Sequence, residues 1–240
     1  METDPKPDQT QITIQSSAEL PNSSSNPITF NQWQPGTWAD FLAIAQQTTT
    51  SYSPQFQSYY QDGWMRFEMT PIGPEHGNQH VIPLNVANLY AGFQSLPIRG
   101  YINTSFRKEG IRACQPDLAF YIDRPLSDLP TGNSPIDLNQ FAPPSLVVEI
   151  GSSSFADDLG TKRLLYERWG VAEYWVLNVA TRSIIAFAIA DGGSREIQTS
   201  QVLPGLSLAI VGEALERLDR EDDGQITRWL INQFQLKTSI

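Results

Sequence analysis

The chain has few of the features that stabilise secreted or membrane proteins. Its 240 residues contain a single cysteine, Cys114, so no internal disulfide can form, and no Cys/His cluster has the spacing of a zinc site. The longest apolar stretches, such as residues 171–179 and 183–190, are far shorter than the roughly 20 residues that span a bilayer. The N-terminus has no basic and then apolar signal pattern. We therefore expect a cytoplasmic protein that does not enter a membrane.

Basic residues are also scarce. The chain has 16 Lys and Arg against 26 Asp and Glu, and its formal net charge of −10 opposes binding to a polyanion. Much of this charge is local, because residues 1–30 carry −3 and residues 213–223 carry −4, which leaves −3 for the rest. That remainder has basic residues that could form one face: Arg99, Arg107, Lys108, Arg112, Lys162 and Arg163. The charge balance argues against high affinity for nucleic acid but excludes no fold.

Length and aromatic content favour one folded domain with extensions. Six Trp, eight Tyr and eleven Phe support a well-packed core, and 240 residues are enough to bury it. Residues 1–30 are rich in Gln, Ser, Thr, Asn and Pro without periodicity, which predicts a disordered tail. We expect the domain to occupy residues 31–210 and a helical C-terminal extension to occupy residues 211–240.

The order of the predicted elements indicates an α/β fold. Thr37 is expected to cap a helix that ends at residue 45. A hairpin over residues 59–69 turns at Asp62-Gly63, which suits a tight primed turn. Further helices are predicted at residues 78–95, with Pro83 in the first turn, and 157–170, and strands at 98–106, 116–122, 145–150, 173–179, 183–190 and 196–203. The continuous apolar run 171–179 is typical of a strand inside a sheet that is covered on both sides.

Two of the apolar segments each carry one acid. Asp117 opens the segment 115–120, and Glu149 lies near the end of the segment 144–150. A carboxylate among apolar residues is costly to desolvate unless a cation meets it. If the two strands are neighbours, the carboxylates converge at a sheet edge on one divalent metal, as in a metal-dependent hydrolase. The alternative is that Asp117 caps a turn after Pro116 and that Glu149 forms a buried ion pair.

Several motifs beside these acids occur together in a known family. They are Asp62-Gly63, Met69-Thr70-Pro71-x-Gly73-Pro74-Glu75-His76-Gly77, Pro116-Asp117, Val148-Glu149-Ile150, Ser152, Asp158, Lys162, Tyr166 and Gly170-Val171-x-Glu173-Tyr174-Trp175. Over about residues 55–215 the chain resembles the Uma-two family of restriction-endonuclease-like proteins, in the PD-(D/E)xK nuclease superfamily. The resemblance implies a restriction-endonuclease-like α/β fold, in which helices flank a central mixed β-sheet with an antiparallel extension and a helical C-terminal tail.

The resemblance also implies Mg²⁺-dependent hydrolysis of phosphodiester bonds in nucleic acid, namely DNA, with Mn²⁺ as a substitute for Mg²⁺. Asp117 and Glu149 would bind the metal, which would polarise the phosphate and lower the pKa of the attacking water. The backbone carbonyl of Ile150 would be a further ligand. Glu75 and His76 belong to the N-terminal motif and would approach the site in a supporting role, although a lone histidine is more often structural. His80 is expected to be structural.

The chain departs from the superfamily pattern at one position. The pattern has lysine two residues after the acid, where this chain has Gly151. In the family, a lysine on the following helix is thought to replace it, and that lysine corresponds to Lys162. Its ammonium would orient the water or stabilise charge on the phosphate, and Tyr166, on the same helix face, would support it. The alternative is a surface pair between Lys162 and Asp158, worth roughly 0.3–0.5 kcal/mol.

Other functions stay open at this point. The glycine at position 151 and the acidic charge also suit a binding or regulatory module that keeps the nuclease fold without turnover. A glycosidase could use Asp117 and Glu149 as acid and base without a metal. The acidic run 219–224 resembles the first half of a calcium loop, but Leu230 occupies the twelfth position, so the bidentate glutamate is absent.

An endonuclease with one site per chain cuts both strands of a duplex most simply as a homodimer. We therefore expect two copies to pair about a two-fold axis. Aromatic residues of the hairpin around Trp64 or of the tail around Trp229 are candidates for the contact.

Overall fold

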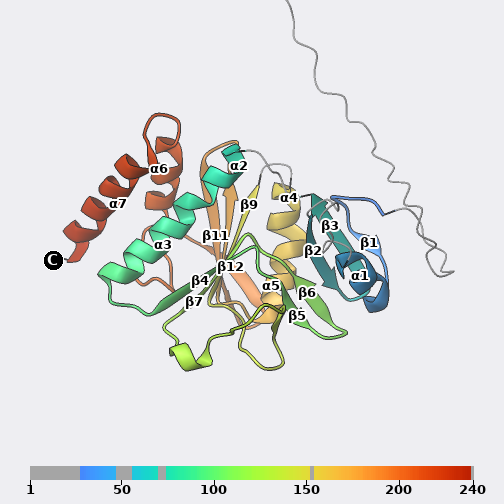
Figure 1. The fold of residues 1–240 in the computed structure, drawn as a ribbon. Coiled ribbons are helices and arrows are strands. Elements are labelled where there is room, and N and C mark those ends of the chain that lie inside the picture. The colour runs from blue at the N-terminus through green and yellow to red at the C-terminus, as the bar shows by residue number, and fades with distance from the viewer. Residues whose placement is uncertain (1–27, 47–55, 70–73, 152–153, 239–240) are drawn as a thin grey trace, which may run out of the picture.

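The structure is a computed structural model that describes residues 28–46, 56–69, 74–151 and 154–238, without the side chains of residues 74–76 and 236–238. Most of the segment expected to be a disordered tail, residues 1–27, lies outside these ranges. Two six-stranded sheets form the scaffold, and helices pack around and between them (Figure 1). The α/β class predicted from the sequence is confirmed.

The first sheet, called the mixed sheet below, has the strand order β12-β11-β10-β9-β7-β4. Its strands are β4 (Ile98–Ile102), β7 (Leu118–Ile122), β9 (Leu146–Gly151), β10 (Glu173–Asn178), β11 (Ser183–Ala190) and β12 (Gly193–Ile197). β9 and β10 are parallel, and the other neighbours are antiparallel. The helical segment between β9 and β10 is therefore the crossover that parallel pairing requires.

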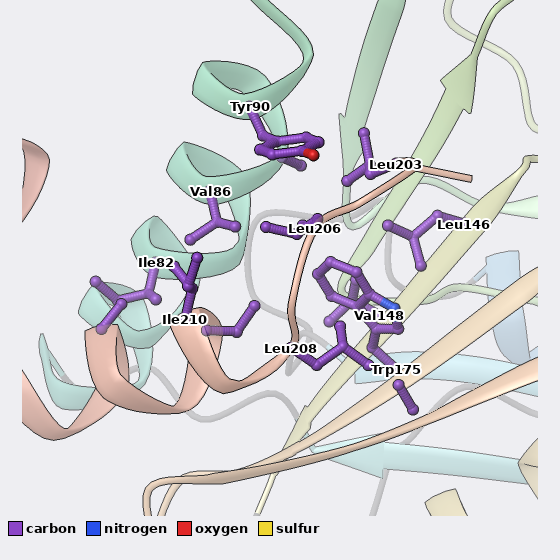
Figure 2. Packing of buried hydrophobic residues seen from close by; sticks show 14 of the residues in the cluster. Ile82, Val86, Tyr90, Leu146, Val148, Trp175, Leu203, Leu206, Leu208 and Ile210 are labelled. Carbon is purple, nitrogen blue, oxygen red and sulfur yellow. The ribbon is translucent and has the colours of Figure 1, made fainter. Parts of the chain in front are cut away.

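One face of the mixed sheet is covered by α3 (Val81–Phe93) and α6 (Ala209–Arg217), and α7 (Asp223–Thr238) packs against these two helices (Figure 1). Figure 2 shows Val148 and Trp175 of the sheet facing Val86 of α3 and Ile210 of α6. These residues belong to the largest apolar cluster of the protein. Its burial stabilises this layer by the hydrophobic effect, at roughly 25 cal/mol for each Å² of apolar surface removed from water.

The second sheet has the strand order β1-β3-β2-β6-β5-β8. Its strands are β1 (Gln34–Pro35), β2 (Phe56–Gln61), β3 (Trp64–Met69), β5 (Phe106–Lys108), β6 (Arg112–Cys114) and β8 (Ile136–Asp137). On β2 and β3, apolar residues such as Phe56 and Phe67 face α1 (Trp38–Ala45) and pack with its Phe41. The alternate residues of both strands face the opposite way, toward the mixed sheet.

The crossover from β9 to β10 lies between the two sheets (Figure 1). It consists of α4 (Phe155–Asp157), a π-helical turn η3 (Asp158–Lys162) and α5 (Arg163–Trp169), and it ends at Gly170 with φ +76°. The left-handed backbone at this position suits glycine. The remaining short helices are α2 (Pro74–Gln79), just before α3, and the 3₁₀ turn η2 (Leu126–Asp128).

Several boundaries confirm the sequence predictions. Thr37 caps α1, the hairpin turns at Asp62-Gly63, and Pro83 lies in the first turn of α3. Two helices flank the acidic stretch near residue 220, as expected for the C-terminal extension.

Two strand predictions were wrong. The segment 98–106 is not one strand, because the chain leaves the mixed sheet after β4 and enters the second sheet at β5. Asn103 makes the change of direction with φ +48°. The strand predicted at 196–203 instead lies earlier, as β12, and ends at Ile197. The following loop is irregular because Leu203 and Leu206 turn into the core, which alternation along a strand would not allow.

Within the described ranges, no helix combines the length and the apolar character that are needed to cross a membrane.

The contribution of the α1 cap to the stability of the protein can be tested, since α1 packs on the second sheet. The Thr37 side chain accepts a hydrogen bond from the Asp40 amide, and the Asp40 side chain accepts one from the Thr37 amide. Thr37→Ala should cost about 1 kcal/mol of folding free energy, which lowers Tm by roughly 2–4 °C in a chain of this size. Thr37→Ser is the matched control and should retain most of the stability. Equal losses in both variants would show that the cap does not stabilise α1.

Candidate functional site

Strand register brings Asp117 and Glu149 to the same place. β7 and β9 are antiparallel neighbours, and their last registered pair is Leu118 with Val148. Asp117 and Glu149 lie one position beyond that pair, on the same face of the sheet as their alternation requires. Both are buried. The Ile150 amide donates to Asp117 Oδ2 at 2.7 Å. The Asp117 side chain therefore connects β7 and β9 at the point where their backbone hydrogen bonds end.

Asp117 is held as an anion by its neighbours. Gln57 Nε2 donates to Asp117 Oδ1 at 2.6 Å, and His80 Nε2 lies 3.4 Å from the same oxygen. Burial raises the pKa of Asp117, but His80, Lys162 and the Ile150 amide outweigh it, and the pKa is lower than usual. His80, expected to be structural, therefore lies at the site.

Glu149 has the opposite tendency. Tyr166 donates to Oε1 at 2.5 Å, and the Tyr59 hydroxyl lies 3.2 and 3.3 Å from the two oxygens. Burial raises the pKa of Glu149 well above its usual value, and the charge of Lys162 only partly offsets this. The nearby carboxylate of Asp117 raises it further. Glu149 consequently keeps a proton more readily than an ordinary glutamate unless another cation joins the cluster.

Lys162 is fully buried among carboxylates. Its Nζ lies 2.6 Å from Glu68 Oε2, 2.8 Å from Asp158 Oδ1 and 3.6 Å from Glu149 Oε2. The amine also lies 4.4 Å from the ring centroid of Tyr59. Burial lowers the pKa of Lys162, but the surrounding carboxylates more than compensate, so its pKa exceeds the usual value and the amine stays charged. The pair with Asp158 exists, but the interpretation that it lies on the surface was wrong.

Side chains of the crossover crowd Gly151, the position at which the superfamily pattern has its lysine. A Cβ added to Gly151 would lie 2.2 Å from Ser154 Oγ and 3.5 Å from Asp158 Oδ2, so a side chain here would require the Ser154 side chain to move. The π-helical turn η3 contains both Asp158 and Lys162. Such turns are rare in proteins, and those that occur are often found at functional sites.

The second sheet supplies residues that the sequence analysis missed. Glu68 of β3 is the nearest acid to Lys162, and Arg66 Nε on the same strand lies 2.5 Å from Glu68 Oε1. Gln57 and Tyr59 of β2 contact the two acids of the mixed sheet. The sequence predicted the hairpin but not what covers its polar side, which packs against the crossover. The only sequence signal was two opposite charges at i,i+2 on one strand face.

Glu75 and His76 lie in α2, but their side chains are outside the described part of the structure. Their supporting role stays a prediction. Tyr166, by contrast, is brought to Glu149 as described above.

The composition of the cluster suits a divalent cation. Four buried acids, Asp117, Glu149, Glu68 and Asp158, face two buried cations, Lys162 and Arg66. Such a surplus of acids over cations favours proton uptake or binding of a further cation. Among the described residues, no three His, Cys, Asp or Glu side chains already form a metal cage. Mg²⁺ does not require one, because it is usually held by one or two carboxylates and keeps several waters.

The fold and these residues together define a class: an α/β protein with paired strand-end acids and a helix-borne lysine enclosed between two sheets. Comparison with known families identifies the particular group. Residues 38–221 match the Uma2 family model, described as "Putative restriction endonuclease". The chain therefore belongs to the Uma2 family.

A solved structure supports the fold. The chain is similar to the crystal structure of a protein titled "a putative nuclease belonging to DUF820" from Anabaena variabilis ATCC 29413, with a TM-score of 0.50 and 18% sequence identity. The alignment covers 75% of this chain and 99% of that one. No curated protein matches the chain.

The raised pKa of Glu149 predicts a stability effect. Folding raises this pKa, so the folded state binds more protons than the unfolded state and stability falls as pH rises above the unfolded value, 4.5. Glu149→Gln resembles the protonated form and should therefore be more stable than the wild type at pH 8, with little difference near pH 4. Thermal melts across this range measure the difference. If the stability of Glu149→Gln relative to the wild type is lower at pH 8 than at pH 4, the pKa of Glu149 is not raised by folding.

Proposed function

We propose that this protein is a Mg²⁺-dependent endonuclease that hydrolyses phosphodiester bonds of DNA, with Mn²⁺ able to replace Mg²⁺. Membership of the Uma2 family supports nuclease chemistry. The observation that carries the proposal is the convergence of Asp117 and Glu149 at the end of two paired strands, beside a charged and buried Lys162.

Asp117, Glu149 and the backbone carbonyl of Ile150 would hold the metal. The bound ion would supply a Lewis acid and lower the pKa of a coordinated water. Asp117 is suited to the first contact because its pKa is already low. Glu149 would release its proton when the ion binds, so metal affinity should increase with pH.

The other groups of the site would orient the reacting parts. Tyr59 and Tyr166 donate to Glu149 and fix the direction of its carboxylate. The surrounding carboxylates raise the pKa of Lys162, which favours the protonated ammonium over a role as a base. Its role would be electrostatic: the ammonium would orient the water or stabilise negative charge that develops on the phosphate.

A second candidate is a binding or regulatory module with the same fold and little turnover. The observation that favours it is the nearly complete burial of the cluster, with Glu149 and Lys162 each only 1% exposed. A phosphodiester would have to displace part of this packing to reach them. The two candidates differ in turnover, which the following experiment measures.

The proposal is tested with supercoiled plasmid and linear duplex incubated with Mg²⁺ or Mn²⁺. The wild type should cleave, and Asp117→Asn and Lys162→Met should each lose at least about 10²-fold in rate, the scale for removal of a single electrostatic group. Lys162→Met should still bind Mn²⁺ in calorimetry, whereas Asp117→Asn should not. Asp128→Asn, at an exposed acid in η2, is the matched control and should cleave normally.

Cleavage that survives Asp117→Asn, or that proceeds fully in EDTA, would contradict the metal mechanism. Mn²⁺ binding at this site without cleavage of any nucleic acid would favour the binding module.

We also propose that the protein acts as a homodimer. Trp64, at the start of β3, is 50% exposed and is the better candidate for the contact. Trp229 is partly buried, with the Arg217 guanidinium 4.2 Å from its ring. Sedimentation at roughly tens of micromolar, well above a typical specific Kd, should show a dimer, and Trp64→Ser should shift it toward monomer. A monomeric wild type at this concentration would exclude a stable dimer.

A further inference from the structure

We propose that Glu68, on the second sheet, is a positioning residue that fixes the ammonium of Lys162 for the reaction at Asp117 and Glu149. The assignment rests on the proposed nuclease function. It also gives the second sheet a part in the site, because Glu68 reaches the cluster from β3, whereas the two strand-end acids belong to the mixed sheet.

The contacts of Lys162 divide into two short ones and one long one. An ammonium has three N–H donors. Nζ donates one of them to Glu68 Oε2 at 2.6 Å and forms an ion pair with Asp158 Oδ1 at 2.8 Å. Glu149 Oε2 at 3.6 Å is beyond that distance. The bond to Glu68 therefore leaves donor capacity on the ammonium for the region of Glu149, where an attacking water or a phosphate oxygen would lie.

Glu68 is itself held in place. Its Oε1 accepts from Arg66 Nε at 2.5 Å. Arg66 also lies 2.8 Å from Asp157 and donates to the Asn31 carbonyl at 2.7 Å. Both Arg66 and Glu68 are buried, so their charges interact in a poorly screened environment. Glu68 therefore presents a fixed anionic acceptor to Lys162.

Removal of the Glu68 charge has a definite consequence. Lys162 would lose its shortest contact, and the remaining partners of its ammonium would be Asp158 and Glu149. A closer ion pair with Glu149 would withdraw the amine from the reacting groups and compete with the metal for the same carboxylate. Glu68 thus acts on the reaction only through the position of Lys162.

The test is a double-mutant cycle of Glu68→Gln and Lys162→Met in the full chain, with plasmid cleavage in Mg²⁺ as one readout and Mn²⁺ binding by calorimetry as the other. Glu68→Gln should lower kcat about tenfold or more with KM nearly unchanged, since loss of one positioned group costs roughly 10²–10³-fold and here the group is displaced, not deleted. It should also weaken Mn²⁺ binding several-fold. In the Lys162→Met background, Glu68→Gln should have no further effect on either quantity.

Thr37→Ala is the control for a merely structural role. It removes the cap of α1, which packs on the opposite face of the second sheet, and it changes no residue of the cluster. Thermal melts should show its loss of stability, while its kcat stays at the wild-type value and well above that of Glu68→Gln.

The outcomes separate this assignment from the proposed function. A wild type that cleaves DNA and binds Mn²⁺, with Glu68→Gln equally active, overturns the role of Glu68 alone. Effects of Glu68→Gln that persist undiminished in the Lys162→Met background do the same. A wild type that neither binds Mn²⁺ nor cleaves overturns the proposed function, and the assignment with it.

Discussion

The burial of one ammonium among several carboxylates is the constraint on which the arrangement of this protein depends. Lys162 is 1% exposed, and the charges of Glu149, Glu68 and Asp158 raise its pKa against the effect of burial. These three acids come from the second sheet, the crossover and the mixed sheet. The lysine therefore connects all three layers, and its charge can be satisfied only when the layers are correctly packed.

The same constraint separates the two strand-end acids electrostatically. Asp117 accepts from Gln57 and a backbone amide and lies beside His80, so its charge is compensated locally. Glu149 contacts tyrosine hydroxyls, and Glu68 and Asp158 lie closer to the Lys162 ammonium than Glu149 does. The pKa values of the two acids are therefore shifted in opposite directions, although they lie at neighbouring register positions. In known enzymes, paired acids with separated pKa values commonly have distinct roles.

Local chemistry determined how much of the fold could be predicted from the sequence. The cap at Thr37, the Asp62-Gly63 turn and the apolar run of β10 each depend on a few adjacent residues, and the structure has all three. The division of residues 98–106 between two sheets depends on distant strands, so no local pattern could show it. The same is true of Glu68 and Arg66, whose alternation on β3 indicates a shared face but not what covers that face.

At the candidate site too, local sequence patterns could not show contacts between residues that are distant in the chain. The acids of β7 and β9 stood out because carboxylates in apolar strands need compensation, and the family resemblance pointed to Lys162. The partner that lies nearest to Lys162 was missed because it comes from a separate sheet, 94 residues earlier in the chain. The second sheet packs its polar side inward, toward the crossover, and buries charges there that an outer layer would normally expose. Burying them is unfavourable for folding unless they are paired, and the ion pairs of Glu68 with Arg66 and Lys162 supply that pairing.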